Sequence, residues 1–161
     1  HLWPGLNTVG VKADNKTGEI TGQMNTIRRM LPKNGGGEIH YSTDGLKKNP
    51  EMLNAVKKLY SEDALVPSTP WIKTRKLMTP TLSAVKSVDA YKVTWNSREN
   101  AEVFRWVLFA KYGDTWETEI LDRDNRAKAL PITKNSKKLN TVAVKAIDRL
   151  SNESDYDALK L

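Results

Sequence analysis

The chain has 161 residues, of which 39% are hydrophobic, and its five Trp and five Tyr exclude a disordered segment. It has no Cys, which excludes disulfides, thiolate metal sites and cysteine nucleophiles. The net charge of +7 is spread out: residues 1–75 hold eleven Lys or Arg against seven acids, and residues 76–161 hold fifteen against twelve. Nucleic-acid binding typically needs a clustered basic stripe, so we expect no nucleic-acid partner. The apolar runs are only a few residues long, so we expect no membrane span.

The first half alternates strand-like and helix-like segments. We expect a short strand at Leu2-Trp3, ended by Pro4-Gly5, and a helix from its N-cap Thr17 to Met30, ended by Pro32 and residues 35–37. A strand over residues 38–42 follows, and a second helix begins at Asn49-Pro50, an N-cap and first-turn proline. This order predicts parallel strands joined by crossover helices. Two parallel strands make an incomplete sheet, which indicates part of a larger α/β array.

The second half alternates with period two. A proline-punctuated connector precedes it, and we place the domain boundary between Trp71 and Pro80. Residues 106–110 are apolar on both faces of one strand, which predicts a central strand. Turn residues recur at spacings of about 8–12, which is typical of a sandwich of antiparallel sheets.

Few residues are candidates for chemistry. The two histidines lack partners at ligand spacing, so we expect no metal and no cofactor. The first interpretation of His40 is a strand histidine that is hydrogen-bonded to a neighbour. The alternative is that His40 and Ser42 line a pocket, because the active sites of α/β barrels lie at the C-terminal ends of the strands. Glu117 and Glu119 share a strand face, but such a pair is usually exposed, and we predict no catalytic residue in this chain.

Tryptophan offers two interpretations. Trp71, beside prolines in the connector, is the candidate domain-interface residue, which would be covered. The alternative is an open platform for a sugar ring at Trp71 or Trp116.

Four motifs in residues 1–75 resemble, in order and spacing, the bacterial glycosyl-hydrolase-like ten family of exported (β/α)8-barrel proteins. They are Leu2-Trp3-Pro4-Gly5-Leu6, Gly18-Glu19-Ile20-x-x-Gln23, Gly37-Glu38-Ile39-His40-Tyr41-Ser42 and Ala64-Leu65-Val66-Pro67-x-x-Pro70-Trp71. Residues 79–161 resemble a fibronectin type III module through Val93-Thr94-Trp95, residues 106–109 and the motif from Val142 to Ser154. Asn140 stands where that module usually has its corner tyrosine, so another contact must fix that loop.

The resemblance implies an α+β chain: a βαβα fragment of a (β/α)8 barrel in residues 1–75, then an immunoglobulin or fibronectin III-like sandwich in residues 76–161. It implies the C-terminal region of an exported glycoside hydrolase, periplasmic or at the cell surface, with its catalytic acids on earlier strands. Trp3, His40 and Ser42 match positions at the barrel mouth and are the candidate carbohydrate-binding residues.

Two hypotheses follow. The sandwich supports the barrel and the chain is inactive alone, or the sandwich is a carbohydrate- or protein-binding module. We also expect open strand edges to allow self-association.

Overall fold

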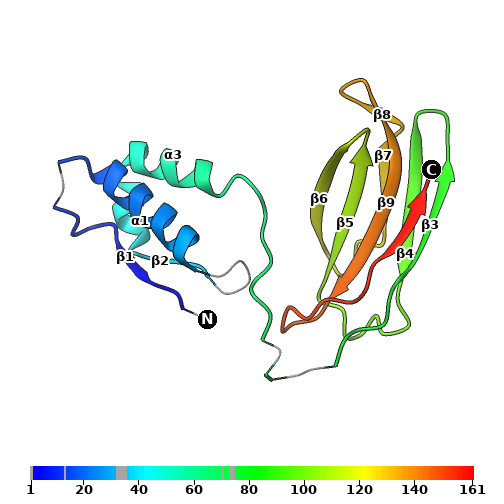
Figure 1. Cartoon of the computed structure of the whole chain (residues 1–161), viewed down its shortest axis with the longest axis horizontal. Coiled ribbons are helices and arrows are strands. Elements are labelled where there is room, and N and C mark those ends of the chain that lie inside the picture. The colour runs from blue at the N-terminus through cyan, green and yellow to red at the C-terminus, as the bar shows by residue number, and fades with distance from the viewer. Residues whose placement is uncertain (1, 13, 32–35, 70, 73–74) are drawn as a thin grey trace. The chain divides into compact units, whose positions relative to one another are not determined.

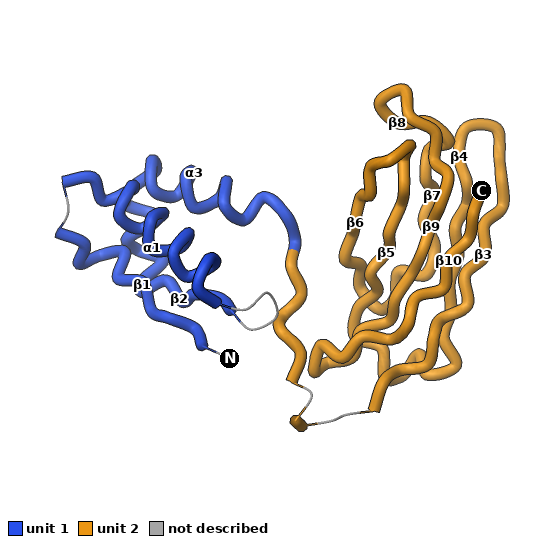
Figure 2. Tube along the Cα trace, viewed as in Figure 1, with its two compact units in different colours: residues 1–63 blue, residues 64–161 orange. Residues whose placement is uncertain are grey.

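A computed structural model describes residues 2–12, 14–31, 36–69, 71–72 and 75–161 (Figure 1). The chain divides into two compact units, residues 1–63 and residues 64–161 (Figure 2). Among the described helices, none has the length and apolar character needed to cross a membrane.

The first unit is a small α/β structure. It contains β1 (Gly5–Asn7), α1 (Lys16–Met30), β2 (Ile39–Tyr41), α2 (Thr43–Lys47) and α3 (Pro50–Leu59). The two strands pair in parallel, as predicted, with Leu6 opposite His40. The sequence pattern did not indicate α2, a single short turn of helix directly after β2.

The first strand lies further along the chain than predicted. Leu2 forms only an isolated parallel bridge with Gly36, and the strand runs through Gly5–Asn7. Pro4 does not end the pairing, because its carbonyl accepts a hydrogen bond from the Ile39 N–H at 3.0 Å. Proline removes a donor but keeps its acceptor, so the ladder continues past it.

One helix cap was predicted correctly and the other was not. The Asn49 side chain accepts a hydrogen bond from the Met52 N–H, which confirms the N-cap of α3. For α1 the predicted cap Thr17 is wrong, because the Asn15 Oδ1 accepts from the Gly18 N–H at 2.7 Å. Pro32 and Gly35, expected to end this helix, lie outside the described residues.

The helices pack on one face of the two-stranded sheet. The core of the unit joins one residue of β1 to residues of all three helices. Its buried members are Leu6, Ile20, Met24, Leu46, Met52 and Val56. The sheet positions on either side of Leu6 and His40 are exposed, including Ile39 and Tyr41. The sheet therefore has one covered face and one open face among the described residues.

The second unit consists of two antiparallel sheets around one core. One sheet contains β3 (Thr81–Lys86), β4 (Ala90–Asn96) and β7 (Ala127–Pro131) in the order β3-β4-β7. The other contains β5 (Arg105–Tyr112), β6 (Thr115–Asp122), β9 (Lys137–Ile147) and β10 (Asp157–Lys160) in the order β10-β9-β5-β6, with β8 (Thr133–Lys134) paired to β9. β5 lies between β9 and β6, which confirms the predicted central strand.

Buried residues of both sheets meet in this core. They are Leu77, Leu82, Val93, Trp95, Val103, Trp106, Leu108, Ala110, Tyr112, Leu130, Leu139, Val142, Val144 and Ala146. Side chains also link the sheet margins: the Asp157 Oδ2 accepts from the Leu82 N–H at 2.8 Å, and Lys128 pairs with Glu119. The structure thus has the sandwich architecture that the alternation predicted.

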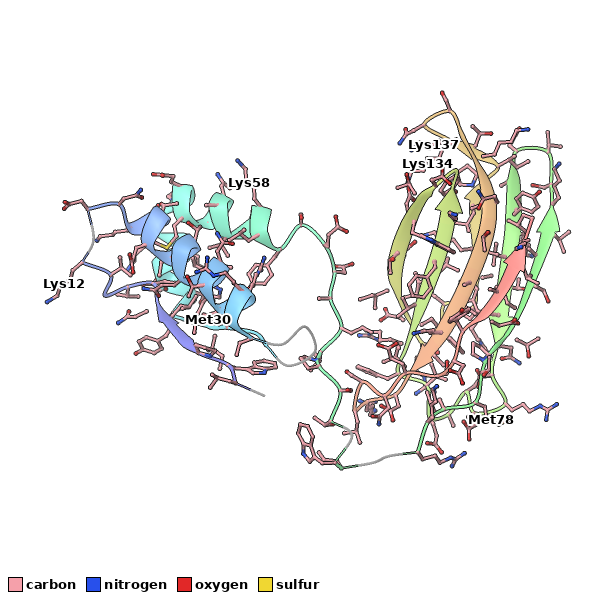
Figure 3. All side chains as sticks on the ribbon, in the orientation of Figure 1. Lys12, Met30, Lys58, Met78, Lys134 and Lys137 are labelled. Atoms are coloured by element: carbon pink, nitrogen blue, oxygen red, sulfur yellow. The ribbon has the colours of Figure 1, made fainter. Side chains whose placement is uncertain are left out.

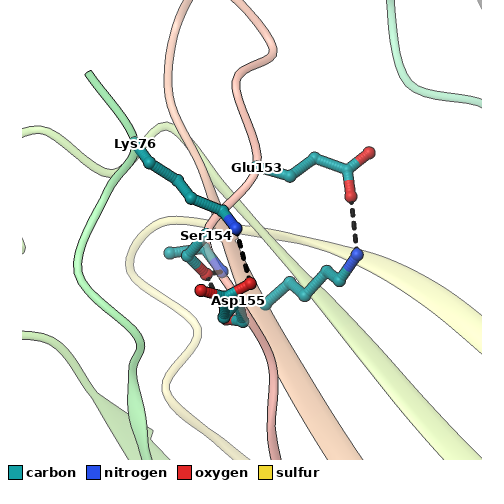
Figure 4. Close-up of polar contacts among 6 residues, drawn as sticks. Lys76, Glu153, Ser154 and Asp155 are labelled. Atoms are coloured by element: carbon teal, nitrogen blue, oxygen red, sulfur yellow. Dashed lines mark hydrogen bonds and ion pairs between the residues drawn. The ribbon is translucent and has the colours of Figure 1, made fainter. Parts of the chain in front are cut away.

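The connector is attached to the sandwich. The Thr69 N–H donates to the Leu150 carbonyl at 3.1 Å, and the Met78 N–H donates to Glu99 Oε2 at 2.8 Å. Lys76 pairs with Asp155 next to the loop that carries Glu153 and Ser154 (Figure 4). These contacts explain why the compact units divide between residues 63 and 64, before the predicted boundary.

Candidate functional site

The candidate site is the open face of the α/β sheet and the C-terminal ends of its strands. The register aligns Gly5 with Ile39, Leu6 with His40, and Asn7 with Tyr41. Successive strand residues point to opposite faces, so Asn7 and Tyr41 lie on the face opposite to buried Leu6. Trp3 is 43% exposed, and a Cβ added to Gly37 would lie 3.6 Å from its ring. The Trp3 ring therefore lies against Gly37.

His40 belongs to a polar cluster on the helix-covered side. Its Nε2 lies 3.4 Å from the Tyr60 hydroxyl, at the end of α3, and the two rings meet edge to face. The Tyr60 hydroxyl donates to Glu38 Oε1 at 2.6 Å, and the Glu38 side chain is only 3% exposed. Arg28 of α1 lies 3.7 Å from the same oxygen and donates to the Leu59 carbonyl. The cluster therefore joins β2 to the ends of α1 and α3.

The electrostatics of this cluster indicate a structural role. Desolvation, followed by the hydrogen bond and negative charge of Glu38, raises the pKa of Tyr60 to about 12, although Arg28 acts in the opposite direction. The phenol therefore stays protonated near neutral pH and keeps donating to the carboxylate. His40 Nδ1 is buried without a hydrogen-bond partner among the described residues. These contacts favour the interpretation of His40 as a strand histidine bonded to a neighbour.

Ser42 contributes mainly through its backbone. Its carbonyl accepts from Thr8 Oγ1 at 2.6 Å, and the adjacent Tyr41 carbonyl accepts from the Thr8 N–H at 2.8 Å. A Cβ added to Gly45 would lie 2.7 Å from the backbone of buried Thr8, so only glycine fits there. The Tyr41–Ser42 peptide bond is cis. The two hydrogen bonds of Thr8 and the close approach of Gly45 fix the ends of both strands to each other and to α2, while a substrate contact for Ser42 stays a prediction.

The two acids that share a face of β6 are each paired with a lysine. Glu117 forms an ion pair with Lys134 at 2.7 Å, and Glu119 pairs with Lys128. Lys134 and Lys137 lie at the β8 end of the sandwich, opposite the end that carries Met78 (Figure 3). Within the described residues, no group of three or more His, Cys, Asp or Glu side chains is arranged to hold a metal ion.

Besides Trp3, two tryptophans are exposed. Trp71 is 66% exposed, and its predicted role at a domain interface stays a prediction. Trp116 on β6 is 51% exposed, with Lys111 Nζ 5.9 Å from its ring centre. The openness of both rings meets the first requirement of a sugar platform.

The motif near the end of the chain stabilises a loop. Buried Asp148 accepts hydrogen bonds from the Leu150 and Asn152 N–H groups and from Asn152 Nδ2. Asn140 donates from Nδ2 to the Gly113 carbonyl at 2.8 Å. This contact holds the β5–β6 turn, so the contact that replaces the corner tyrosine in its own loop stays a prediction.

Comparisons with known proteins add little. No family model matches the chain, and no curated protein matches it. One similar solved structure is pectate lyase PelI from Erwinia chrysanthemi with tetragalacturonic acid, at 18% identity over 50% of this chain and 28% of that chain, with a TM-score of 0.39. A second is the Clostridium perfringens spore cortex lytic enzyme SleM, at 16% identity over 53% of this chain and 28% of that chain, with a TM-score of 0.40. A third is the glycoside hydrolase domain Spr0440, Endo-D, from Streptococcus pneumoniae R6, at 17% identity over 54% of this chain and 15% of that chain, with a TM-score of 0.41. All three are carbohydrate-active proteins. The chain spans less than a third of each of them, and likenesses this weak carry no functional argument here.

Proposed function

We propose that residues 1–75 form part of the (β/α)8 barrel of a glycoside hydrolase and that the sandwich is a fibronectin III-like accessory domain. The observation that carries the proposal is the half-covered parallel sheet. Parallel sheets are normally covered on both faces, yet here Ile39 is 55% and Tyr41 70% exposed on the side opposite to the helices. In a barrel, that side would face the packed interior made by the remaining strands.

The motif series supports the same proposal. β2 falls within one of the motifs that resemble the barrel family, β1 overlaps another, and α1 and α3 are helices that follow the two strands. No catalysis is proposed for this chain alone, because its described acids at the sheet, such as Glu38, are engaged in structural contacts.

We assign the sandwich a supporting role. The connector is bonded to the sandwich through Thr69, Lys76 and Met78. A bonded connector suits a domain that holds a barrel in place.

A binding module is the second candidate, and the exposure of Trp116 favours it. Calorimetric titration of the whole chain with a panel of soluble polysaccharides tests it. Heat that disappears in Trp116→Ala but persists in Trp71→Ala would assign glycan binding to β6. Absence of heat with every polysaccharide leaves the supporting role.

Two further expectations belong to this proposal. Export to the periplasm or cell surface is inferred from the resemblance alone. Self-association is proposed because, among the described residues, β1 and β2 pair only with each other, and open edges can pair with another copy. Sedimentation at increasing concentration should show association that weakens when Ile39 is replaced by Lys.

The coding sequence upstream of His1 gives the most direct test. We expect further strand–helix repeats there, and the longer protein should hydrolyse a polysaccharide while the 161-residue chain does not. An unrelated upstream fold would refute the barrel proposal. Hydrolysis by the short chain would refute only the statement that it is inactive alone.

A further inference from the structure

We infer that the outer face of the sheet formed by β10, β9, β5 and β6 binds an acidic polysaccharide, whose uronic acid rings stack on Trp116 and pair with the lysines beside it. The inference rests on the second candidate function, the binding role that the exposure of Trp116 favours. It adds the chemical class of the ligand and the residues that recognise it. The barrel proposal does not depend on it.

One row of residues crosses this sheet. Trp116 on β6 lies directly opposite Lys111 on β5. On the other side of β5, Lys111 lies opposite Thr141 of β9, which in turn lies opposite Lys160 of β10. Neighbouring strands are about 4.8 Å apart, so this Trp116 row is roughly 14 Å long. A row of that length can contact more than one ring of a polysaccharide.

The Trp116 row lies on the outer side of the sheet. Ala110 and Val142, the chain neighbours of Lys111 and Thr141, are buried in the core of the sandwich. Successive strand residues point to opposite faces, so Lys111 and Thr141 point away from that core. Trp116 is accordingly 51% exposed. The row is therefore open to a ligand.

The row carries positive charge that the acids around it do not neutralise. Within the described part of the chain, Lys160 forms no ion pair, and Lys111 pairs only with the exposed Asp114, at 4.0 Å. Glu117 is the residue of β6 that follows the row, so it points to the opposite face, where it pairs with Lys134. An acidic ligand therefore complements the row.

The closeness of ring and ammonium favours a uronic acid over other acidic ligands. Lys111 Nζ lies 5.9 Å from the centre of the Trp116 ring. A uronic acid bears its carboxylate on a carbon of the sugar ring, so stacking of that ring on Trp116 brings the carboxylate close to the ammonium. An acidic peptide has the charge without a CH-rich ring face, and a neutral sugar has the ring face without the charge.

The sheet also positions the two groups. The Lys111 side chain is only 31% exposed, so most of its stem is packed while its ammonium stays accessible. The next row of the same face is uncharged and consists of Thr118, Phe109, Ala143 and Ala158. It places no acid beside the ligand. Binding groups on strands of a sheet are held more precisely than groups on loops.

Calorimetric titration of the whole chain tests the inference. The acidic probes are polygalacturonate, alginate and hyaluronate, which contain different uronic acids. The comparisons are fully methyl-esterified polygalacturonate, which has the same backbone without the charge, and polyglutamate, an acidic peptide. We expect at least one acidic polysaccharide to bind about tenfold more tightly than both comparisons, and to bind more weakly as salt is added.

Three outcomes would overturn the inference. Equally tight binding of the esterified polymer would keep the binding role of the sandwich and refute the acidic ligand. Equally tight binding of polyglutamate would refute the sugar. Absence of heat with every probe would refute both the inference and the second candidate function, and would leave the barrel proposal unaffected.

Substitutions assign the binding to the row. Trp116→Ala should weaken binding of the acidic polysaccharide by about tenfold, and Lys111→Gln and Lys160→Gln by about threefold each. Asp114→Asn should strengthen it by about twofold, because it removes a competing carboxylate. Lys92→Gln on β4, in the other sheet, is the matched control and should bind like the unchanged chain. Equal weakening in Lys92→Gln and Lys111→Gln would overturn the assignment to this face.

Discussion

Three described residues other than glycine have left-handed backbone conformations. Asn135 and Ser136 have φ of 50° and 63° in the turn between β8 and β9, and Ser151 has φ of 59° in the loop after β9. Two-residue hairpin turns with two left-handed residues favour glycine at the second of them, which is Ser136 here. These serines hold a conformation that costs about 1–2 kcal/mol for a residue with a side chain.

Replacing Ser151 by Gly should stabilise the sandwich. The backbone strain disappears, partly offset by the greater freedom of glycine in the unfolded chain, so we expect a gain of about 0.5–1 kcal/mol in the free energy of unfolding. Urea denaturation measures it. Ser151→Ala is the matched control and should give no gain. A loss of stability in the glycine variant would show that the serine hydroxyl matters more than the strain.

Asp148 should be one of the most sensitive residues of the sandwich. Its carboxylate accepts three hydrogen bonds in the β9–β10 loop and is buried, so Asp148→Ala leaves three donors without their acceptor. We expect a loss of about 2–4 kcal/mol in the free energy of unfolding. Asp148→Asn keeps one carbonyl acceptor and should lose less. Equal losses in both variants would mean that the charge matters more than the number of bonds.

The raised pKa of Tyr60 predicts a loss of stability at high pH. The folded protein keeps the phenol proton up to about pH 12, whereas an unfolded tyrosine releases it near 10.0. The stabilisation from this group is therefore complete below pH 10 and is lost as pH rises through 12. Burial also raises the pKa of Tyr112, so absorbance titration of tyrosinate should show late ionisation of which the Tyr60 step alone is absent from Tyr60→Phe. In Glu38→Gln that step should move to lower pH; an unmoved step would refute the role of Glu38.

Local hydrogen bonds decide where the helices begin. α1 starts where the Asn15 side chain reaches the Gly18 N–H, two residues before the predicted cap. A Cβ on Gly18 would lie 2.5 Å from the Asn15 amide nitrogen, so a larger residue at position 18 would force the capping side chain to shift. Both Asn15 and Thr17 are residue types that cap helices, and only the conformation of residues 14–16 selects between them.

Asn15→Ala should destabilise the α/β unit by about 1 kcal/mol, because it leaves a helix-terminal N–H without its acceptor. Thr17→Ala is the matched control, since its side chain does not cap the helix, and should change stability by less than about 0.5 kcal/mol. Circular dichroism during thermal unfolding of the two variants provides the measurement. Equal destabilisation would indicate that the cap shifts between the two residues.

The two units differ in how much core they bury. The α/β unit has six residues in its buried cluster, and the sandwich has fourteen. Hydrophobic burial is the main source of folding free energy, so the sandwich is expected to be the more stable unit. The connector contributes to the stability of the sandwich through the bonds of Thr69, Lys76 and Met78.

A chain of residues 64–161 should therefore be more stable than a chain of residues 79–161. The shorter chain loses the bonds from Thr69 to Leu150, from Lys76 to Asp155 and from Met78 to Glu99, together with buried Leu77. We expect a difference of about 2–4 kcal/mol by urea denaturation. A chain of residues 67–161 keeps all these contacts and should match the longer one. Equal stability of the 64–161 and 79–161 chains would refute the statement that the bonds of the connector stabilise the sandwich.

Spacing along the chain was enough to locate most elements. Most of the predicted features depend on residues a few positions apart. They are the apolar positions of α1 and α3, the Asn49-Pro50 start of α3, the central position of β5 and the alternation of the sandwich strands. Such neighbours are brought together by the backbone geometry of a helix or strand, whatever the rest of the fold. Helix, strand and sandwich could therefore be predicted before any contact was known.

Contacts between distant residues decided the remainder. His40 meets Tyr60, 20 residues away, and Leu82 meets Asp157, 75 residues away. The Pro4 carbonyl keeps β1 paired with β2, and the helices cover the side of the sheet that holds His40 and leave Tyr41 open. Strand periodicity shows that neighbouring residues face opposite sides, but only packing determines which side is covered. For that reason the motif indicated the right strand, and only the tertiary structure showed which of its side chains the helices cover.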